Sequence, residues 1–192
     1  MDAGFLRYIK NSLFVSIAAC LLSMVIAVMA GYALSRYYKL KAVKLSNLAM
    51  MLSQMIPGVL LLVPLYLIMQ KLNILESYKS LILAYTTFVI PLCTFMMSSF
   101  FDTVPLALEE AAEIDGANAW QRFRFITLPL LQPALASSVI YNLIGGLKLY
   151  DVIIALTDGG PAKKTHSLAT YIANRYFDAE RAGYAAAIGV FS

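Results

Sequence analysis

Residues 11–35 read NSLFVSIAACLLSMVIAVMAGYALS, a stretch without a single Asp, Glu, Lys or Arg. Three further windows, 46–70, 80–101 and 125–147, are equally free of charge. Each is long enough to cross a bilayer as a helix, which takes roughly 20 apolar residues. Charged residues make up 14% of the 192-residue chain, whereas soluble domains carry about a quarter. The sequence therefore predicts an all-α fold, a polytopic bundle of transmembrane helices.

We expect one transmembrane domain over the whole chain, residues 1–192. Its four full spans lie near residues 11–34, 46–69, 80–101 and 134–156, with a partial span at 182–192. That last run is too short to cross a bilayer, so we expect a truncated chain, with a re-entrant end as the alternative. Pro57 and Pro64 fall inside the second span, where a packing kink and a bend that lines a pathway are both open interpretations.

Several kinds of site find no support in the sequence. Cys20 and Cys93 lie in apolar windows, where cysteine behaves as a small hydrophobic residue, so we expect no disulfide framework. His166, the single histidine, lies in a polar stretch and is interpreted as a solvated loop residue rather than a metal ligand. The chain has no convincing nucleophile–base set and no GxxxxGK[ST] phosphate loop. We expect no enzyme activity, no cofactor and no nucleic-acid partner.

The orientation in the membrane rests on one dense basic segment. Residues 35–45 contain four basic residues and no acidic one, which is typical of a cytoplasmic loop. The loop at residues 102–133 is then cytoplasmic too, and the first ten residues are external. The total of basic residues on the two sides does not decide the orientation by itself.

The loop at residues 102–133, here called the acidic loop, reads DTVPLALEEAAEIDGANAWQRFRFITLPLLQP. Asp102 or Thr103 can cap a helix, and Pro105 suits its first turn. Gly116 supplies a left-handed stop, after which a second short helix is expected over 117–125. The acidic loop is therefore predicted to form two short helices joined by a glycine turn.

The stretch EEAAEIDGA within this loop concentrates negative charge. It holds four of the eleven acidic residues of the chain. Its alanines leave little side-chain bulk, so a partner can approach closely, and Trp120 and Phe123 at i and i+3 form an aromatic knob. A solvated acidic loop between two spans is the plainer alternative.

The spacing within the acidic loop resembles a known family. Glu110-Ala111-Ala112, then Gly116, Ile126 and Leu128-Pro129, match the EAA loop of ABC-importer permease subunits at every fixed position. The resemblance implies the MetI-like transmembrane fold, and a first short helix that sits in a cleft of a cytoplasmic ATPase. The residues it implies for coupling to that ATPase are Glu109, Glu110, Ala111, Ala112, Asp115, Gly116, Ile126, Leu128 and Pro129.

The resemblance also implies partners and a location. Such a permease pairs with a second permease subunit, here as a heterodimer, with a dimer of ATP-binding-cassette ATPases, and with an extracytoplasmic solute-binding protein. It lies in the bilayer of the bacterial or archaeal plasma membrane as a multi-pass protein.

The wider run FFDTVPLALEEAAEIDGA, residues 100–117, is similar to the sugar-importer branch, in particular to permeases of maltose-like systems. The last third of the chain, with LTDGGPAKKT at residues 156–165, resembles the opposite member of the permease pair. Family members have a further helix before the one that starts at Asn11 and a complete last helix. A sugar or glycoside is the implied substrate class, with no indication of which one.

Four residues of the fourth span are candidates for lining a substrate path. Lys148 and Asp151 are expected to share one helical face, and ionisable groups at membrane depth normally face a cavity or each other. Asn142 and Tyr150 complete the set. A structural ion pair near the outer interface is the alternative. The alternatives to the importer are a gradient-driven secondary transporter or channel that uses Lys148 and Asp151, and a non-functional permease fragment.

Overall fold

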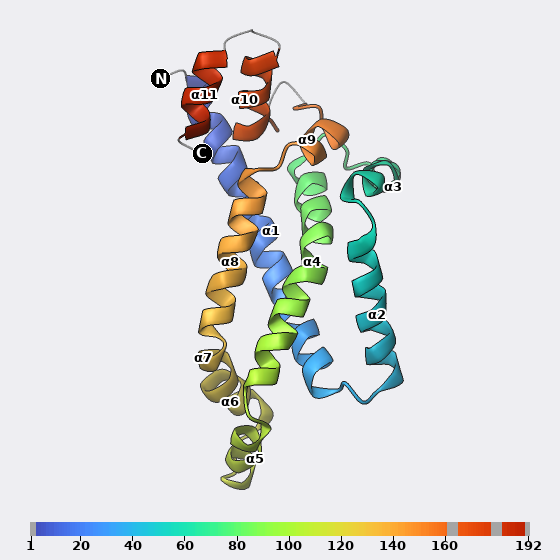
Figure 1. Cartoon of the computed structure of the whole chain (residues 1–192), viewed down its shortest axis with the longest axis vertical. Helices are drawn as coiled ribbons and strands as arrows, with labels where there is room; N and C mark the ends of the chain where they lie inside the picture. The colour runs from blue at the N-terminus through green and yellow to red at the C-terminus, as the bar shows by residue number, and fades with distance from the viewer. Residues whose placement is uncertain (1–2, 161–164, 178–181, 191–192) are drawn as a thin grey trace. The chain divides into compact units, whose positions relative to one another are not determined.

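The computed structural model describes residues 3–160, 165–177 and 182–190, and every regular element in these ranges is a helix (Figure 1). The expected all-α fold is confirmed. In chain order the elements are α1 (Ala3–Arg36), α2 (Lys41–Met55), α3 (Gly58–Lys71), α4 (Tyr78–Thr103), α5 (Leu106–Ile114), α6 (Ala119–Arg122), the π-helix η1 (Phe123–Thr127), α7 (Leu128–Leu130), α8 (Gln132–Leu147), α9 (Asp151–Leu156), α10 (Leu168–Phe177) and α11 (Ala182–Val190).

The chain divides into two compact units, each described here by itself. Unit 1 comprises Met1–Leu22, Ile56–Phe88 and Tyr141–Ser192, and unit 2 comprises Ser23–Met55 and Val89–Ile140. The long helices α1, α4 and α8 contribute residues to both units.

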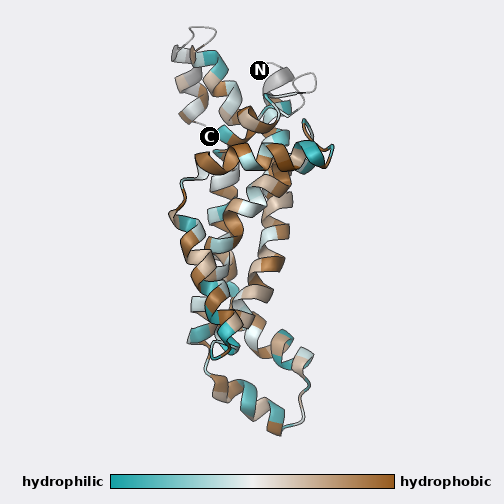
Figure 2. Cartoon of the chain, turned by 90° about the vertical axis from the view of Figure 1, so that its right-hand side faces the viewer, coloured by the Kyte–Doolittle hydropathy of each residue, from teal (hydrophilic) through white to brown (hydrophobic). Residues whose placement is uncertain are grey.

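Hydrophobic residues dominate the long helices (Figure 2). α1, over Leu6–Arg36, and α4 each have the length and hydropathy to cross a membrane. Two interrupted pairs meet the same criterion when each is taken together: α2 with α3, and the segment Ala119–Leu130 with α8. A helix satisfies its own backbone hydrogen bonds, which is what a bilayer demands of any spanning segment. The four expected spans remain predictions.

The helix expected over 46–69, with a kink or a bend at its prolines, is divided into two helices. The chain forms α2 up to Met55 and starts α3 at Gly58, with Pro57 at the N-cap position of α3. A proline disfavours the helical conformation of the residue before it, and this is why the break falls here. Pro64, in contrast, is accommodated inside α3.

The helix expected over 134–156 is interrupted too. α8 ends at Leu147 and α9 begins at Asp151, with Tyr150 as its N-cap residue. Lys148 and Asp151 therefore do not share the face of one helix, which corrects that expectation. Helical i, i+3 spacing brings two side chains together only while the helix continues between them.

Unit 2 contains a close contact between α1 and α4. A Cβ atom placed on Gly31 would lie 2.6 Å from the Cβ of Met97, so only glycine permits this approach. The ring of Tyr32 meets that of Phe101 edge-on, with centroids 5.4 Å apart. Met97 and Phe101 are fully buried. The C-terminal part of α1 is thus packed tightly against α4.

Unit 1 contains a largely buried group of polar side chains without Asp, Glu, Lys or Arg, which we call the neutral cluster. Its members are Asn11, Ser12, Tyr78, His166, Ser167 and Thr170. Asn11 donates to the backbone carbonyl of His166 at 3.0 Å and accepts from the Tyr78 hydroxyl at 2.9 Å. The hydroxyl of Ser12 accepts from the backbone N–H of Leu168 at 2.9 Å. The cluster ties α1 to the segment before α10.

The solvated loop position expected for His166 is wrong. The residue is 7% exposed, and its Nδ1 lies 3.1 Å from the hydroxyl of Thr170. The ring also meets that of Tyr8 edge-on, at 5.9 Å between centroids. The imidazole of His166 therefore contacts a side chain of the protein, the hydroxyl of Thr170, where water was expected.

Of the partial span expected at 182–192, α11 covers Ala182–Val190, and the last two residues lie outside the described ranges.

Candidate functional site: the acidic loop

The first short helix of the acidic loop, α5, starts one turn later than the capping prediction implies. α4 continues through Asp102 and Thr103, so neither residue caps α5. Pro105 is the N-cap residue, and Glu109 lies in the first turn. A proline at a helix start has no N–H that would lack a partner, and a carboxylate there interacts favourably with the helix dipole.

The glycine stop of α5 is confirmed. Gly116 has φ +85°, in the left-handed region. Its N–H bonds to the carbonyl of Glu113 at 3.0 Å, and the N–H of Ala117 bonds to the carbonyl of Ala112 at 2.9 Å. These two bonds form a Schellman motif, which satisfies carbonyls at the end of the helix. The turn therefore has a fixed geometry.

The second helix starts with a capping box that the sequence analysis did not identify. The side chain of Asn118 accepts from the N–H of Gln121 at 2.9 Å, and the Gln121 side chain accepts from the N–H of Asn118 at 2.8 Å. This S/T/D/N-x-x-E/Q pattern is readable from the sequence. The rings of Trp120 and Phe123 lie in contact, with centroids 5.9 Å apart, which confirms the predicted pair.

The second helix does not end near Phe125 as expected. It continues through the π-helix Phe123–Thr127 into α7, and so includes Pro129. A π-helical turn does not use the backbone hydrogen bonds from residue i to residue i−4, which a proline would otherwise break in an α-helix. Arg122 forms an ion pair with Glu113, which links this helix back to α5 across the glycine turn.

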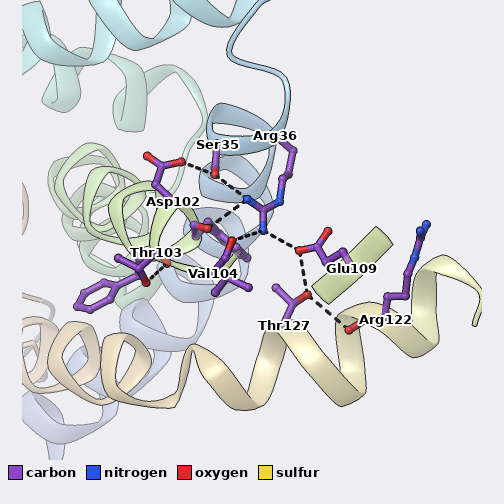
Figure 3. Close-up of polar contacts among 10 residues, drawn as sticks. Ser35, Arg36, Asp102, Thr103, Val104, Glu109, Arg122 and Thr127 are labelled. Atoms are coloured by element: carbon purple, nitrogen blue, oxygen red, sulfur yellow. Dashed lines mark hydrogen bonds and ion pairs between the residues drawn. The ribbon is translucent and has the colours of Figure 1, made fainter. Parts of the chain in front are cut away.

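The second feature of the site is a largely buried ion pair between Arg36, the last residue of α1, and Glu109 of α5. The Nη2 of Arg36 lies 2.7 Å from Oε1 of Glu109 (Figure 3). The side chains are 13% and 10% exposed respectively. The hydroxyl of Thr127, on the π-helix, donates to the same Oε1 at 3.3 Å. One carboxylate oxygen thus joins three segments of the chain.

Arg36 also contacts the end of α4. Its Nη1 donates to the carbonyl of Phe101 at 3.2 Å and its Nη2 to the carbonyl of Val104 at 3.4 Å. Next to it, the Ser35 hydroxyl donates to Oδ1 of Asp102 at 2.5 Å (Figure 3). We call this group, which consists of Ser35, Arg36, Asp102, Glu109 and Thr127, the charged cluster.

Most of the residues predicted for coupling are exposed or half-buried. Exposed members of that set are Glu110, Ala111, Asp115, Gly116 and Pro129, and half-buried members are Ala112, Ile126 and Leu128. Glu109 is the exception, because it is 8% exposed. The loop therefore exposes polar and small residues together with large apolar ones, such as Ile114 and Phe125, and buries one glutamate.

Sequence reasoning missed Arg36, Ser35 and Thr127. The sequence places Arg36 only within the basic segment 35–45, which is predicted to be cytoplasmic. The position of Arg36 could have indicated a role, because the residue directly follows the uncharged window 11–35 and is the last residue of α1. Arginine next to membrane depth calls for a partner, yet nothing local identified Glu109 as that partner.

The structure separates the four candidates for a substrate path. Asn142 is fully buried in α8, and its backbone carbonyl accepts from the Tyr85 hydroxyl at 2.5 Å. Lys148, Tyr150 and Asp151 are exposed around the break between α8 and α9. Within the described ranges, no group of three or more His, Cys, Asp or Glu side chains is arranged to hold a metal ion.

Comparison with protein families gives one match over most of the chain. The family model described as "Binding-protein-dependent transport system inner membrane component" matches residues 13–192.

Two curated relatives illustrate the similarity. The diacetylchitobiose uptake system permease protein NgcG of Streptomyces coelicolor is 32% identical over 98% of this chain and 63% of its own length. The trehalose/maltose transport system permease protein MalF of Thermococcus litoralis is 37% identical over 52% of this chain and 33% of its own length. The chain thus spans less than two thirds of the length of these relatives.

A solved structure shares the fold. A chain of a bacterial alginate ABC transporter, in complex with an alginate pentasaccharide-bound periplasmic protein, has a TM-score of 0.78 at 22% identity. The match covers 100% of this chain and 74% of that chain. The expected fold of ABC-importer permeases is confirmed, as is the resemblance drawn from the EAA spacing.

Proposed function

Because the chain belongs to the family of binding-protein-dependent transport system inner membrane components, we propose that it is a permease subunit of an ATP-binding-cassette importer. It forms part of the membrane pathway for a solute and takes its energy from a separate cytoplasmic ATPase. Solute crosses by alternating access between this chain and a second permease subunit.

The observation that carries this proposal is the geometry of α5. The helix is short, begins at a proline and ends in a Schellman turn at Gly116. Ala111 and Glu110 are both exposed, so α5 offers a small side chain and a carboxylate to a partner. A helix of this kind can lie in a groove of a partner, where its carboxylate meets basic groups at the rim.

The proposed substrate class is a sugar or glycoside. Support comes from the relatives, whose names specify diacetylchitobiose and trehalose or maltose. The exposed residues Lys148, Tyr150 and Asp151 are proposed to line the path together with the partner permease. Asn142 contributes only if the pathway opens α8 to solvent, because it is buried here.

The proposed assembly contains this chain, a second permease subunit, two ATPase subunits and an extracytoplasmic solute-binding protein. It lies in the plasma membrane of a bacterium or archaeon, with the acidic loop and residues 35–45 on the cytoplasmic side. The contact between Arg36 and Glu109 supports placing these two segments on one side, since it joins them directly.

Cross-linking to the ATPase tests the proposal. In a background with Cys20→Ala and Cys93→Ala, we introduce Ala111→Cys and treat membranes that contain the cognate ATPase with a short bis-maleimide. A covalent adduct with the ATPase is expected, because Ala111 is exposed on α5.

Ile140→Cys is the matched control, since that residue is also exposed but lies on α8. It should give no adduct. If Ala111→Cys gives none either, although both proteins are folded and present in the same membranes, the assignment is wrong.

A further inference from the structure

The two consecutive glutamates of α5 differ in exposure and in partner. Glu109 is 8% exposed and pairs with Arg36, whereas Glu110 is exposed. Neighbouring residues of a helix do not share a face, so a partner that binds the outer face meets Glu110 and not Glu109. The inner carboxylate has a different task.

The chain connectivity distinguishes α1 from α4 and α8. α5 is joined through the backbone to α4 on one side and, through residues 115–131, to α8 on the other. α1 has no such link, because residues 37–77 separate it from α4. When α5 moves, α4 and α8 are pulled through the chain, but α1 follows only through side-chain contacts.

Arg36 supplies the charged contact of this kind. It is the last residue of α1, and its guanidinium holds Glu109 of α5 at 2.7 Å while it donates to two carbonyls at the end of α4. Hydrogen bonds between ionised groups are roughly twice as strong as neutral ones. In a buried site the loss of one partner is also costly. Such a contact resists separation when α5 is displaced.

Glu109 extends the contact to the second helix. Its Oε1 accepts from Thr127, which is 1% exposed and lies on the π-helix. π-Helical turns occur frequently at functional sites. The carboxylate therefore holds α1, α5 and the π-helix as one polar network.

We infer that Arg36 and Glu109 are positioning residues that pass the displacement of α5 to α1 during coupling to the ATPase. The inference rests on the proposed function, and it assigns different roles to two adjacent glutamates. Glu110 serves the contact with the partner, and Glu109 transmits movement to α1 inside this chain.

The experiment follows α1 and α8 separately. In the Cys20→Ala, Cys93→Ala background a nitroxide is attached at Val25→Cys on α1 or at Ile140→Cys on α8, both exposed residues of unit 2. The complex with the second permease and the ATPase is reconstituted in lipid. The change in nitroxide accessibility on addition of Mg-ATP and vanadate is then measured for wild type, Glu109→Gln and Arg36→Gln.

In wild type both labels should respond to the nucleotide. In Glu109→Gln and Arg36→Gln the response at Val25 should fall at least about threefold, as for mutations in a coupling network, while Ile140 continues to respond and the ATPase stays bound. The double variant should lose no more than either single variant, because both changes remove one interaction. Arg36→Lys, which keeps the charge, should retain part of the response.

Glu110→Gln is the matched control on the outer face. It should weaken binding of the ATPase but leave the ratio of the two responses unchanged in complexes that still form. The inference is overturned if Glu109→Gln leaves the response at Val25 unchanged. It is also overturned if both labels stop responding to the nucleotide, or if neither variant assembles with the second permease and the ATPase. In either case the contact is purely structural. A wild-type chain that binds no ATPase would instead refute the proposed function.

Discussion

The charged cluster of unit 2 and the neutral cluster of unit 1 are two ways to pair polar groups in an apolar chain. The charged cluster depends on one ion pair, Arg36 with Glu109, between residues 73 positions apart. The neutral cluster distributes its contacts over many uncharged hydrogen bonds, including Asn11 to His166 across 155 positions. Both connect α1 to distant parts of the sequence.

The difference between the clusters lies in how each responds to a lost partner. A neutral hydrogen bond contributes about 1 kcal/mol net, so the neutral cluster can lose one bond and keep the others. Removal of one partner from a buried ion pair leaves an uncompensated charge and costs about 3–5 kcal/mol. The charged cluster is therefore the more sensitive of the two to a single change, as suits a contact that transmits movement.

The largest effect is expected for Arg36→Leu. This change leaves the carboxylate of Glu109 buried without its cation, so we expect a loss of about 4 kcal/mol in the free energy of unfolding. Unfolding of the purified chain in mixed micelles with increasing denaturing detergent measures it.

The double variant Arg36→Leu, Glu109→Leu sharpens this prediction, because it removes both charges. It should recover at least about half of the loss, since apolar replacements of a buried pair are often tolerated. Lys41→Leu, at an exposed cation of the same segment, should change the free energy by less than about 0.5 kcal/mol. A single variant as stable as wild type would contradict the role given to the ion pair.

The next prediction compares the loss of stability when alanine replaces each of two glycines with left-handed backbone conformations, Gly159 and Gly116. Gly159 has φ +76°, and a Cβ placed on it would lie 2.2 Å from the ring of His166. Gly159→Ala therefore combines backbone strain with overpacking, for a loss of about 3 kcal/mol. Gly116→Ala meets nothing within 4 Å, so only the strain of about 1 kcal/mol remains. Equal losses in the same denaturation assay would show that His166 does not pack as described.

A smaller effect than those of Arg36→Leu and Gly159→Ala is expected for Asn11→Leu in the neutral cluster. It removes a donor to the carbonyl of His166 and the acceptor of the Tyr78 hydroxyl. We expect a loss of about 2 kcal/mol, because buried polar groups lose their partner while the rest of the cluster stays bonded. Ser46→Ala, which removes an exposed hydroxyl, is the control and should be nearly neutral. A loss equal to that of Arg36→Leu would erase the contrast between the two clusters.

Local features of the acidic loop were predictable because they involve residues close in sequence. The turn at Gly116 and the contact of Trp120 with Phe123 both follow from spacing of a few residues. The capping box of Asn118 with Gln121 was readable in the same way but was overlooked. The end of the second helix was not predictable, because the π-helix carries it through Pro129.

The sequence by itself determined that the chain is built of apolar helices, where the acidic loop lies, and to which family the loop spacing belongs. Charge-free windows and short spacings are local properties, and local properties can be read in order along the chain. Only the tertiary structure decided that Glu109 turns inward to Arg36 and that His166 is buried. Those outcomes depend on which distant segments pack together, and the sequence pattern within one segment does not indicate which other segment it contacts.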